Sequence, residues 1–205
     1  MGPSSPMNPA EAELVAAVRL LVLALRNLEV EYFVGGSIAS MVFGEPRLTL
    51  DADVVARLRM EHADRIVALL GSDFYADLDA IRAAIDHHRS FNLIHLETMV
   101  KIDVYVAAPS AFVESEFARR IRRDVSASGA PLELDLATPE DVVLAKLEWF
   151  RRGGEVSDRQ WRDVLGVLKV QGNRLDVEYL QRWAPDLRVE DLLQRARDEA
   201  GQTGG

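Results

Sequence analysis

The stretch VGGSIASMVFGEPRLTLDADVVARL, residues 34–58, joins a glycine turn to a pair of aspartates. Gly35 and Gly36 follow an apolar run, and Ser37 comes directly after them. Asp51 and Asp53, separated by one alanine, follow later in the same stretch. A strand built only for stability would not carry two carboxylates, because a buried charge is costly. The stretch therefore predicts a turn in the fold and, next to it, a chemical site.

A turn of this kind suits an anion. The segment EYFVGG, residues 31–36, predicts a short buried strand that ends in the turn, and Ser37 is expected to open the next helix. Backbone N–H groups at a helix N-terminus bind phosphate well, and glycine lets the backbone approach closely. Taken alone, the motif is more often a tight turn with an N-cap serine. Because carboxylates follow it, Gly35, Gly36 and Ser37 are candidates for binding a triphosphate.

The two aspartates are expected on one face of a strand, since side chains at positions i and i+2 point the same way. A third acid, Asp103, interrupts the apolar run MVKIDVYVA on the same face as Lys101 and Tyr105. Adjacent anions repel strongly unless a cation lies between them. Mg²⁺ (or Mn²⁺) prefers such oxygen ligands and commonly binds carboxylates together with substrate phosphates. Two ions held this way can clamp an in-line phosphoryl displacement, with Asp103 also acting as general base.

The periodicity of the remaining chain predicts an α/β (α+β) fold, a mixed sheet flanked by helices and followed by a small C-terminal helical bundle. The expected order is helix, strand, helix, strand, helices and hairpin, then a last strand. The segments concerned are a helix over 14–28, strands in 31–36 and 48–58, helices over 62–70 and 77–86, two strands within 90–107 joined near Glu97, and a strand at 131–136.

Beyond residue 137 the pattern becomes wholly helical. Thr138 is expected to cap a helix that begins at Pro139, and Ser157 with Gln160 predicts a capping box for the next helix. Two further helices are expected at about 176–184 and 188–199, separated by Pro185. The expected divisions are a disordered tail at 1–9, a core at 10–137, a helical lobe at 138–200 and a second disordered tail at 201–205.

Composition narrows the class of protein. The 205 residues carry a formal net charge of −9, which argues against a generally basic surface that coats nucleic acid. The densest basic run is RRIRR, residues 119–123; such runs usually form solvated faces, and a polyanionic partner would have to use one. The absence of cysteine fits a reducing cytoplasm. The apolar stretch Leu14–Leu25 is interrupted by Arg19, so no membrane partner is expected.

The combination of GGS, a thirteen-residue spacer, DAD and a later KIDV resembles the DNA polymerase beta-type nucleotidyltransferase superfamily. Arg47 and Thr49, at alternate positions before the aspartates, resemble the usual approach to its metal-binding pair. The segments VVLAKLEWFRR and QWRDVLGVL are similar to the AbiEii-like branch, the toxins of abortive-infection and toxin–antitoxin systems. The resemblance covers roughly residues 34–170, and it implies that Lys146 and Asp163 are functional residues.

The residues around Lys146 agree with this in part. Its neighbours in the expected helix are mostly apolar, so the ammonium needs a partner, which a triphosphate would supply. Asp163 lies in a helix whose other side chains face a core. It could orient Lys146 or an arginine rather than touch a substrate, and both interpretations remain open.

These observations lead to one leading expectation and two alternatives. The leading expectation is a Mg²⁺-dependent nucleotidyltransferase that moves an NMP group from a nucleoside triphosphate to a hydroxyl acceptor, with the acceptor being RNA, protein or a small molecule. Within the AbiEii-like branch it would be the toxin of a toxin–antitoxin system, with an antitoxin partner. The alternatives are a catalytically inactive nucleotide-binding protein of the same fold, and an enzyme that modifies an antibiotic hydroxyl.

Overall fold

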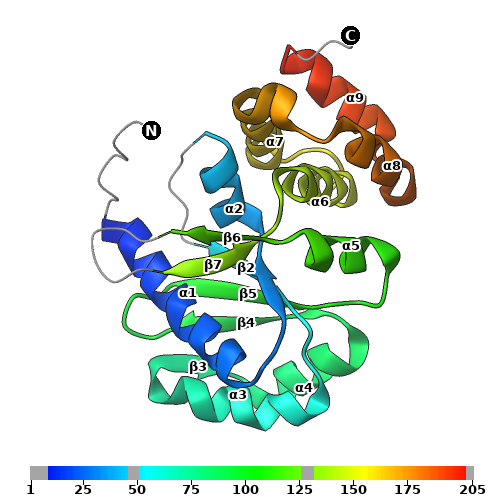
Figure 1. Cartoon of the computed structure of the whole chain (residues 1–205). Helices are drawn as coiled ribbons and strands as arrows, with labels where there is room; N and C mark the ends of the chain where they lie inside the picture. The colour runs from blue at the N-terminus through cyan, green and yellow to red at the C-terminus, as the bar shows by residue number, and fades with distance from the viewer. Residues whose placement is uncertain (1–8, 46–50, 126–131, 202–205) are drawn as a thin grey trace. The chain divides into compact units, whose positions relative to one another are not determined.

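A computed structural model describes residues 9–45, 51–125 and 132–201. The chain divides into two compact units, whose elements Figure 1 labels. The sheet unit consists of Met1–Val34 and Leu48–Leu136, and the helical unit of Gly35–Arg47 and Ala137–Gly205. Arg47, Thr49 and the expected tails, apart from Pro9 and Gly201, lie outside the described residues.

The sheet unit is built on a mixed sheet of seven strands, counted over the described residues, in the order β3-β4-β5-β2-β1-β7-β6. Strand β2 runs parallel to β5, and β1 runs parallel to β7, while the other neighbouring pairs are antiparallel. This confirms the predicted α/β class. The strands are β1 (Tyr32–Val34), β2 (Asp51–Ala56), β3 (Phe74–Ala76), β4 (Ser90–His95), β5 (Lys101–Val106), β6 (Ile121–Asp124) and β7 (Glu133–Leu136).

The two central strands β2 and β5 have the period of two that the sequence predicts. Alternate residues of each strand are fully or almost fully buried, and the residues between them are half-buried. One face of this strand pair therefore belongs to the hydrophobic core, and the opposite face carries the polar side chains. The buried set is Ala52, Val54, Ala56, Ile102, Val104 and Val106.

Four α-helices belong to the described part of the sheet unit: α1 (Pro9–Asn27), α3 (Ala63–Leu70), α4 (Leu78–His87) and α5 (Ala111–Arg119). Short 3₁₀ turns at Met60–His62 and Gly71–Asp73 flank α3. Helix α1 contacts α3 and β2, and α3 runs beside α4 (Figure 1). The amphipathic pattern predicted for α1 is confirmed, since Leu14, Leu21 and Leu25 are completely buried.

Three elements of this unit were not predicted, namely β3, α5 and β6. Two of them are weakly patterned: β3 has three residues, and β6 has no buried residue. The arginine run 119–123 ends α5 and opens β6, where it forms an edge strand beside β7. Charged residues are common on edge strands, but a run of arginines contains no period of two from which to predict one.

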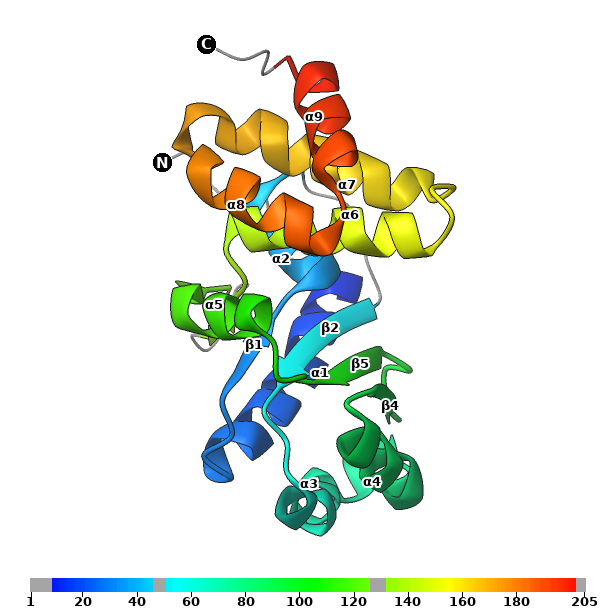
Figure 2. The same cartoon turned by 90° about the vertical axis from the view of Figure 1, so that its right-hand side faces the viewer.

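The helical unit contains α2 (Gly36–Phe43), α6 (Pro139–Arg152), α7 (Asp158–Gln171), α8 (Val177–Leu187) and α9 (Glu190–Glu199), with a 3₁₀ turn at Gly172–Arg174. Helices α6 and α7 run side by side, and α2 packs against both (Figure 2). Gly44 and Gly166 permit this, because an added Cβ would lie 3.0 Å from the backbone of Val167 or 3.2 Å from that of Glu45.

The N-cap predicted at Thr138 is confirmed, and so is the N-cap serine of the predicted capping box at Ser157. The hydroxyl of Thr138 accepts from the backbone N–H of Asp141, and that of Ser157 accepts from the backbone N–H of Gln160. The predicted break at Pro185 is wrong, since Pro185 lies inside α8. A proline beyond the first turn removes one backbone hydrogen bond of the helix, and α8 continues only to Leu187 after it. The helix ends instead at Leu187, and its C-cap Arg188 has a left-handed backbone with φ of 59°. No helix in the described ranges is long and apolar enough to cross a membrane.

Candidate functional site

The three predicted aspartates lie on two neighbouring strands of the sheet unit. Because β2 and β5 are parallel and in register, Asp53 lies opposite Asp103, and Asp51 lies opposite Lys101. All four residues belong to the half-buried set of their strands, opposite to the core. Neighbouring strands are about 4.8 Å apart. The structure thus brings Asp51, Asp53 and Asp103 to one surface, which we call the carboxylate face.

Lys101 is part of this face. Its Nζ lies 2.9 Å from Oδ2 of Asp103, with 43% of the lysine side chain and 17% of the aspartate side chain exposed. The hydrogen bond to Asp103 raises the pKa of Lys101, and the charges of Asp51 and Asp53 act in the same direction against the effect of burial. Lys101 is therefore a cation held among anions. The sequence predicted that the Lys101 side chain lies on the same face as Asp103, but not that it pairs with it.

Tyr105 is the other residue of this face that sequence reasoning assigned no role. Burial raises its pKa to about 12, and the charges of Asp53 and Asp103 and a hydrogen bond with Asp53 act in the same direction. The phenol is consequently neutral at ordinary pH and donates to the Asp53 carboxylate. It fixes one oxygen of that aspartate from the side of β5.

The carboxylate face fits a hard divalent cation by its chemistry. In the arrangement of the described side chains, no three acidic or histidine residues converge as a ready metal-binding group, and Asp103 is engaged by Lys101. Yet the donors are carboxylate oxygens on adjacent strands, partly exposed, and the face already attracts a positive group to Asp103. The residues present therefore fit Mg²⁺ or Mn²⁺.

The glycine turn lies in the helical unit. Gly35 is the N-cap of α2, and Gly36 has a left-handed backbone, φ of 49°, which glycine adopts without a steric penalty. The helix begins at Gly36, one residue before the predicted start at Ser37. Ser37 is buried, and its Oγ accepts a hydrogen bond of 3.2 Å from Nη2 of Arg159. The turn thus combines helix N–H groups with a nearby guanidinium.

Arg159 was not predicted as a site residue. It lies in the first turn of α7, 122 positions from Ser37 in the sequence. No local pattern marks such a contact, because it depends on how α7 packs against α2. A positive charge at Ser37 adds to the attraction that an N-terminal helix end has for phosphate.

The turn and the aspartates are attached to paired strands. Strand β1 ends at Val34, which lies opposite Val54 of β2 and opposite Leu136 of β7. Gly35 follows Val34 directly in the chain, and Asp53 directly precedes Val54. The strands β1, β2 and β5 are therefore neighbours in the sheet in the same order in which GGS, DAD and KIDV follow one another in the sequence.

Lys146 of α6 and Asp163 of α7 form a buried ion pair. Nζ of Lys146 lies 2.8 Å from Oδ2 of Asp163, and only 10% and 6% of the two side chains are exposed. Of the two interpretations left open by the sequence, an Asp163 that orients Lys146 agrees with this contact. A carboxylate at this distance holds the ammonium in one position.

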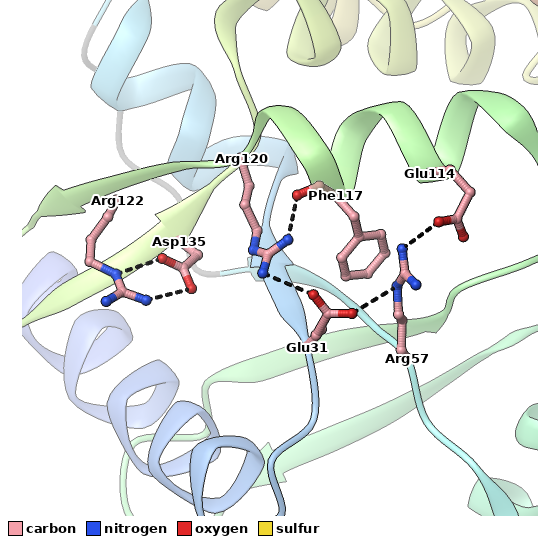
Figure 3. A network of polar contacts seen from close by, with 7 residues as sticks. All are labelled: Glu31, Arg57, Glu114, Phe117, Arg120, Arg122 and Asp135. Atoms are coloured by element: carbon pink, nitrogen blue, oxygen red, sulfur yellow. Dashed lines mark hydrogen bonds and ion pairs between the residues drawn. The ribbon is translucent and has the colours of Figure 1, made fainter.

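Two arginines of the run at 119–123, Arg120 and Arg122, form ion pairs within the sheet unit (Figure 3). Arg120 lies 3.0 Å from Glu31, and Arg122 lies 2.8 Å from Asp135. Arg57 of the neighbouring loop lies 2.8 Å from Glu114, and its guanidinium stacks 4.3 Å from the ring centre of Phe117. The hydrogen bonds of Arg120 and Arg122 join β6 and α5 to the rest of the unit, which gives these arginines a structural role.

Comparisons with known proteins identify relatives in structure only. No protein-family model matches the chain, and no curated protein matches its sequence. The solution structure of the antibiotic-resistance factor ANT(2'')-Ia is similar over 90% of this chain and 96% of that chain, with 16% identity and a TM-score of 0.51.

Two further structures give the same result. The crystal structure of ANT(2'')-Ia in complex with adenylyl-2''-tobramycin matches 85% of this chain and 96% of that chain, with 14% identity and a TM-score of 0.52. An antigenic nucleotidyltransferase-like protein from Paracoccidioides brasiliensis matches 94% of both chains, with 16% identity and a TM-score of 0.51. These likenesses show that the chain has the fold of structurally characterised nucleotidyltransferases.

Proposed function

We propose that the protein is a Mg²⁺-dependent nucleotidyltransferase that moves an NMP group from a nucleoside triphosphate to a hydroxyl acceptor. The observation that carries this proposal is the register of β2 with β5, which sets Asp53 opposite Asp103 with Asp51 on the same face. The nucleotidyltransferase-like fold of the chain supports it. The AbiEii-like branch remains a prediction from the sequence.

In this proposal Asp51, Asp53 and Asp103 hold the divalent ion. When bound, Mg²⁺ or Mn²⁺ would offset the charge of the triphosphate and the charge that develops during transfer. The Asp103 carboxylate accepts the proton of the acceptor hydroxyl, whose oxygen attacks the α-phosphorus. The bond from the α-phosphorus to the bridging oxygen breaks, and pyrophosphate leaves. The proton then passes from Asp103 to solvent.

The triphosphate is assigned to the helical unit's residues. The backbone N–H groups at Gly35, Gly36 and Ser37 contact phosphate oxygens, as helix N-termini commonly do. Lys146 contributes positive charge, and Asp163 orients its ammonium through the 2.8 Å contact. These residues act by electrostatics and positioning, which supply most of the catalysis in phosphoryl transfer.

The test is transfer of label from each of the four α-³²P nucleoside triphosphates in the presence of Mg²⁺. Bulk tRNA, the protein itself and a panel of hydroxylated antibiotics serve as acceptors. We expect a labelled product with at least one acceptor, and its loss in Asp51→Ala and Asp53→Ala variants that remain folded by circular dichroism. Equal labelling by these variants and the wild type would refute the proposal.

An inactive nucleotide-binding protein would behave differently in the same experiment. It would bind nucleotide with Mg²⁺ in a calorimeter, and no acceptor would become labelled. We therefore expect the wild type to show both binding and transfer.

The chain's lack of cysteine also suits the reducing cytoplasm, which is where we place the reaction.

A small-molecule acceptor is the second candidate, favoured by one observation. The chain covers 96% of ANT(2'')-Ia, whose complex contains an adenylylated tobramycin. We propose an antibiotic-type hydroxyl as the first acceptor to be tried, and the toxin role as the competing one. Inducible expression separates them: a toxin arrests growth unless its antitoxin partner is present, whereas an antibiotic-modifying enzyme raises resistance without arrest.

A further inference from the structure

The carboxylate face contains a cation of its own. Lys101 lies opposite Asp51 in the strand register, and its Nζ is 2.9 Å from Oδ2 of Asp103. It therefore sits among the carboxylates that the proposed function assigns to the divalent ion. A metal ion bound by all three aspartates and an ammonium bound by Asp103 compete for the same oxygens.

We infer that Lys101 is an internal counter-ion of the site, which pairs with Asp103 in the metal-free protein and must release it when Mg²⁺ binds. This inference rests on the proposed function, because it takes Asp51, Asp53 and Asp103 as the metal ligands. Lys101 is then a positioning residue. It offsets the repulsion among the three carboxylates and sets how tightly the site binds its ion.

Formal charges give this role a physical reason. Three carboxylates on adjacent strands repel one another, and the repulsion would separate the strands' polar side chains without a nearby cation. Adding the Lys101 ammonium leaves two net negative charges on the face, which match one divalent ion. The same ammonium repels that ion and occupies Asp103, so it weakens metal binding while it stabilises the metal-free state.

The choice of lysine also fits a cation that must move. Of the 24 Lys and Arg residues in the chain, only Lys101, Lys146 and Lys169 are lysine. Arginine grips a carboxylate with a planar fork, whereas lysine is a point charge on a flexible stem. With 43% of its side chain exposed, Lys101 can turn from Asp103 to water at little cost.

The experiment measures the binding of Mn²⁺ alone to the full chain, without nucleotide or acceptor, from the electron paramagnetic resonance signal of free Mn²⁺. Lys101→Met removes the charge and keeps the length of the side chain. We expect this variant to bind Mn²⁺ about 5-fold more tightly than the wild type, the size of effect that an exposed ion pair produces. Lys101→Arg keeps the charge, and we expect it to bind no more tightly than the wild type.

Two further variants serve as controls. Lys169→Met removes the same charge from an exposed lysine of α7 and should leave the Mn²⁺ affinity unchanged. Asp51→Asn, alone and combined with Lys101→Met, should weaken Mn²⁺ binding at least about 10-fold, which identifies the site that is being titrated. Circular dichroism and thermal unfolding check that each variant is folded.

A second measurement follows Lys101 itself. With three lysines in the chain, ¹⁵N-lysine labelling gives few ammonium signals, and that of Lys101 is assigned by its loss in Lys101→Arg. Mg²⁺ should shift the Lys101 signal in the wild type and leave it in place in Asp51→Asn. The Lys169 signal should not move in either protein.

The outcomes separate the inference from the proposed function. If Asp51→Asn weakens Mn²⁺ binding but Lys101→Met binds as the wild type does, the counter-ion role is overturned and the metal site stands. If neither the wild type nor Lys101→Met binds Mn²⁺, both ideas fail. Tighter binding by Lys101→Met that Asp51→Asn abolishes supports both.

Discussion

The protein contains two lysine–aspartate pairs of nearly the same length in very different surroundings. Lys101–Asp103 in the sheet unit is 2.9 Å long, and Lys146–Asp163 in the helical unit is 2.8 Å long. The first pair is partly exposed on a strand surface, whereas the second is almost completely buried between two helices. The distance alone therefore says little about what either pair contributes.

Burial decides the difference. Water and salt weaken the attraction in the exposed pair, so its members can separate and take other partners. The buried pair has lost its hydration, and neither member can be left alone without a large penalty. We conclude that the exposed pair is suited to exchange one cation for another, and the buried pair to keep a charge in one place.

The largest expected effect is on activity at the exposed pair. Asp103→Asn removes the residue that we propose as a metal ligand and proton acceptor. If that proposal holds, we expect labelled transfer to fall by about 1000-fold or more, since several kcal/mol of charge stabilisation are lost. The free energy of unfolding should change little. Measuring transfer and urea unfolding on the same preparation checks both. If Asp103→Asn kept its transfer activity, the Lys101–Asp103 pair would have no role in catalysis and would not differ in function from the buried pair.

The next largest effect is on stability at the buried pair. Lys146→Met leaves the Asp163 carboxylate buried without the Lys146 ammonium, and we expect a loss of about 3–5 kcal/mol in the free energy of unfolding. The double variant Lys146→Met with Asp163→Leu should recover much of this loss, since both charges are then absent. Urea unfolding of the single and double variants measures the coupling. A loss of less than about 1 kcal/mol in the single variant would show that the pair is effectively solvated.

Tyr105, which donates a hydrogen bond to Asp53 on the carboxylate face, provides a third test through the pH dependence of stability. Its pKa in the folded protein is raised to about 12, so between pH 10 and 12 the unfolded chain loses this proton first. Stability that Tyr105 contributes below pH 10 should therefore fall as the pH rises towards 12. Tyr105→Phe should cost about 1 kcal/mol at neutral pH and remove this part of the decline. Urea midpoints at pH 8 and 11 compare the two proteins.

The smallest effect is expected for the stability of the exposed pair. Lys101→Met should change the free energy of unfolding by less than about 1 kcal/mol, and 0.5 M salt should reduce even this difference. In contrast, salt should hardly affect the loss caused by Lys146→Met. Unfolding curves at low and high salt for both variants test this contrast directly. If salt did not change the loss of unfolding free energy in Lys101→Met, the Lys101–Asp103 pair would behave like the buried pair.

Much of the fold, and the strand that carries part of the candidate site, could be predicted from local patterns. The alternation around Asp51 and Asp53 gave the strand and its polar face, and the caps at Thr138 and Ser157 gave the starts of two helices. The arginine run of β6 has no such pattern, so its strand was missed. The break predicted at Pro185 was wrong because α8 continues past it to Leu187 and ends at the left-handed C-cap Arg188.

Contacts between distant segments had no signature in the sequence. The ion pair of Lys101 could have been suspected, since it is two residues from Asp103 on one face. The hydrogen bond from Arg159 to Ser37 could not, because it depends on the packing of α7 against α2. The types of the side chains and the two-residue period of the strands thus located the candidate site residues. The packing of distant segments determined which residues they contact.

The pairing of β2 with β5 has a consequence for how the protein matures. Asp53 and Asp103 become neighbours only when two strands some 50 residues apart in the chain align side by side. Such long-range pairing comes with loop-closure costs and forms cooperatively with the core beneath it. A growing or partly unfolded chain therefore lacks the complete set of carboxylates, and competence to bind an ion at this face would report that the sheet has closed.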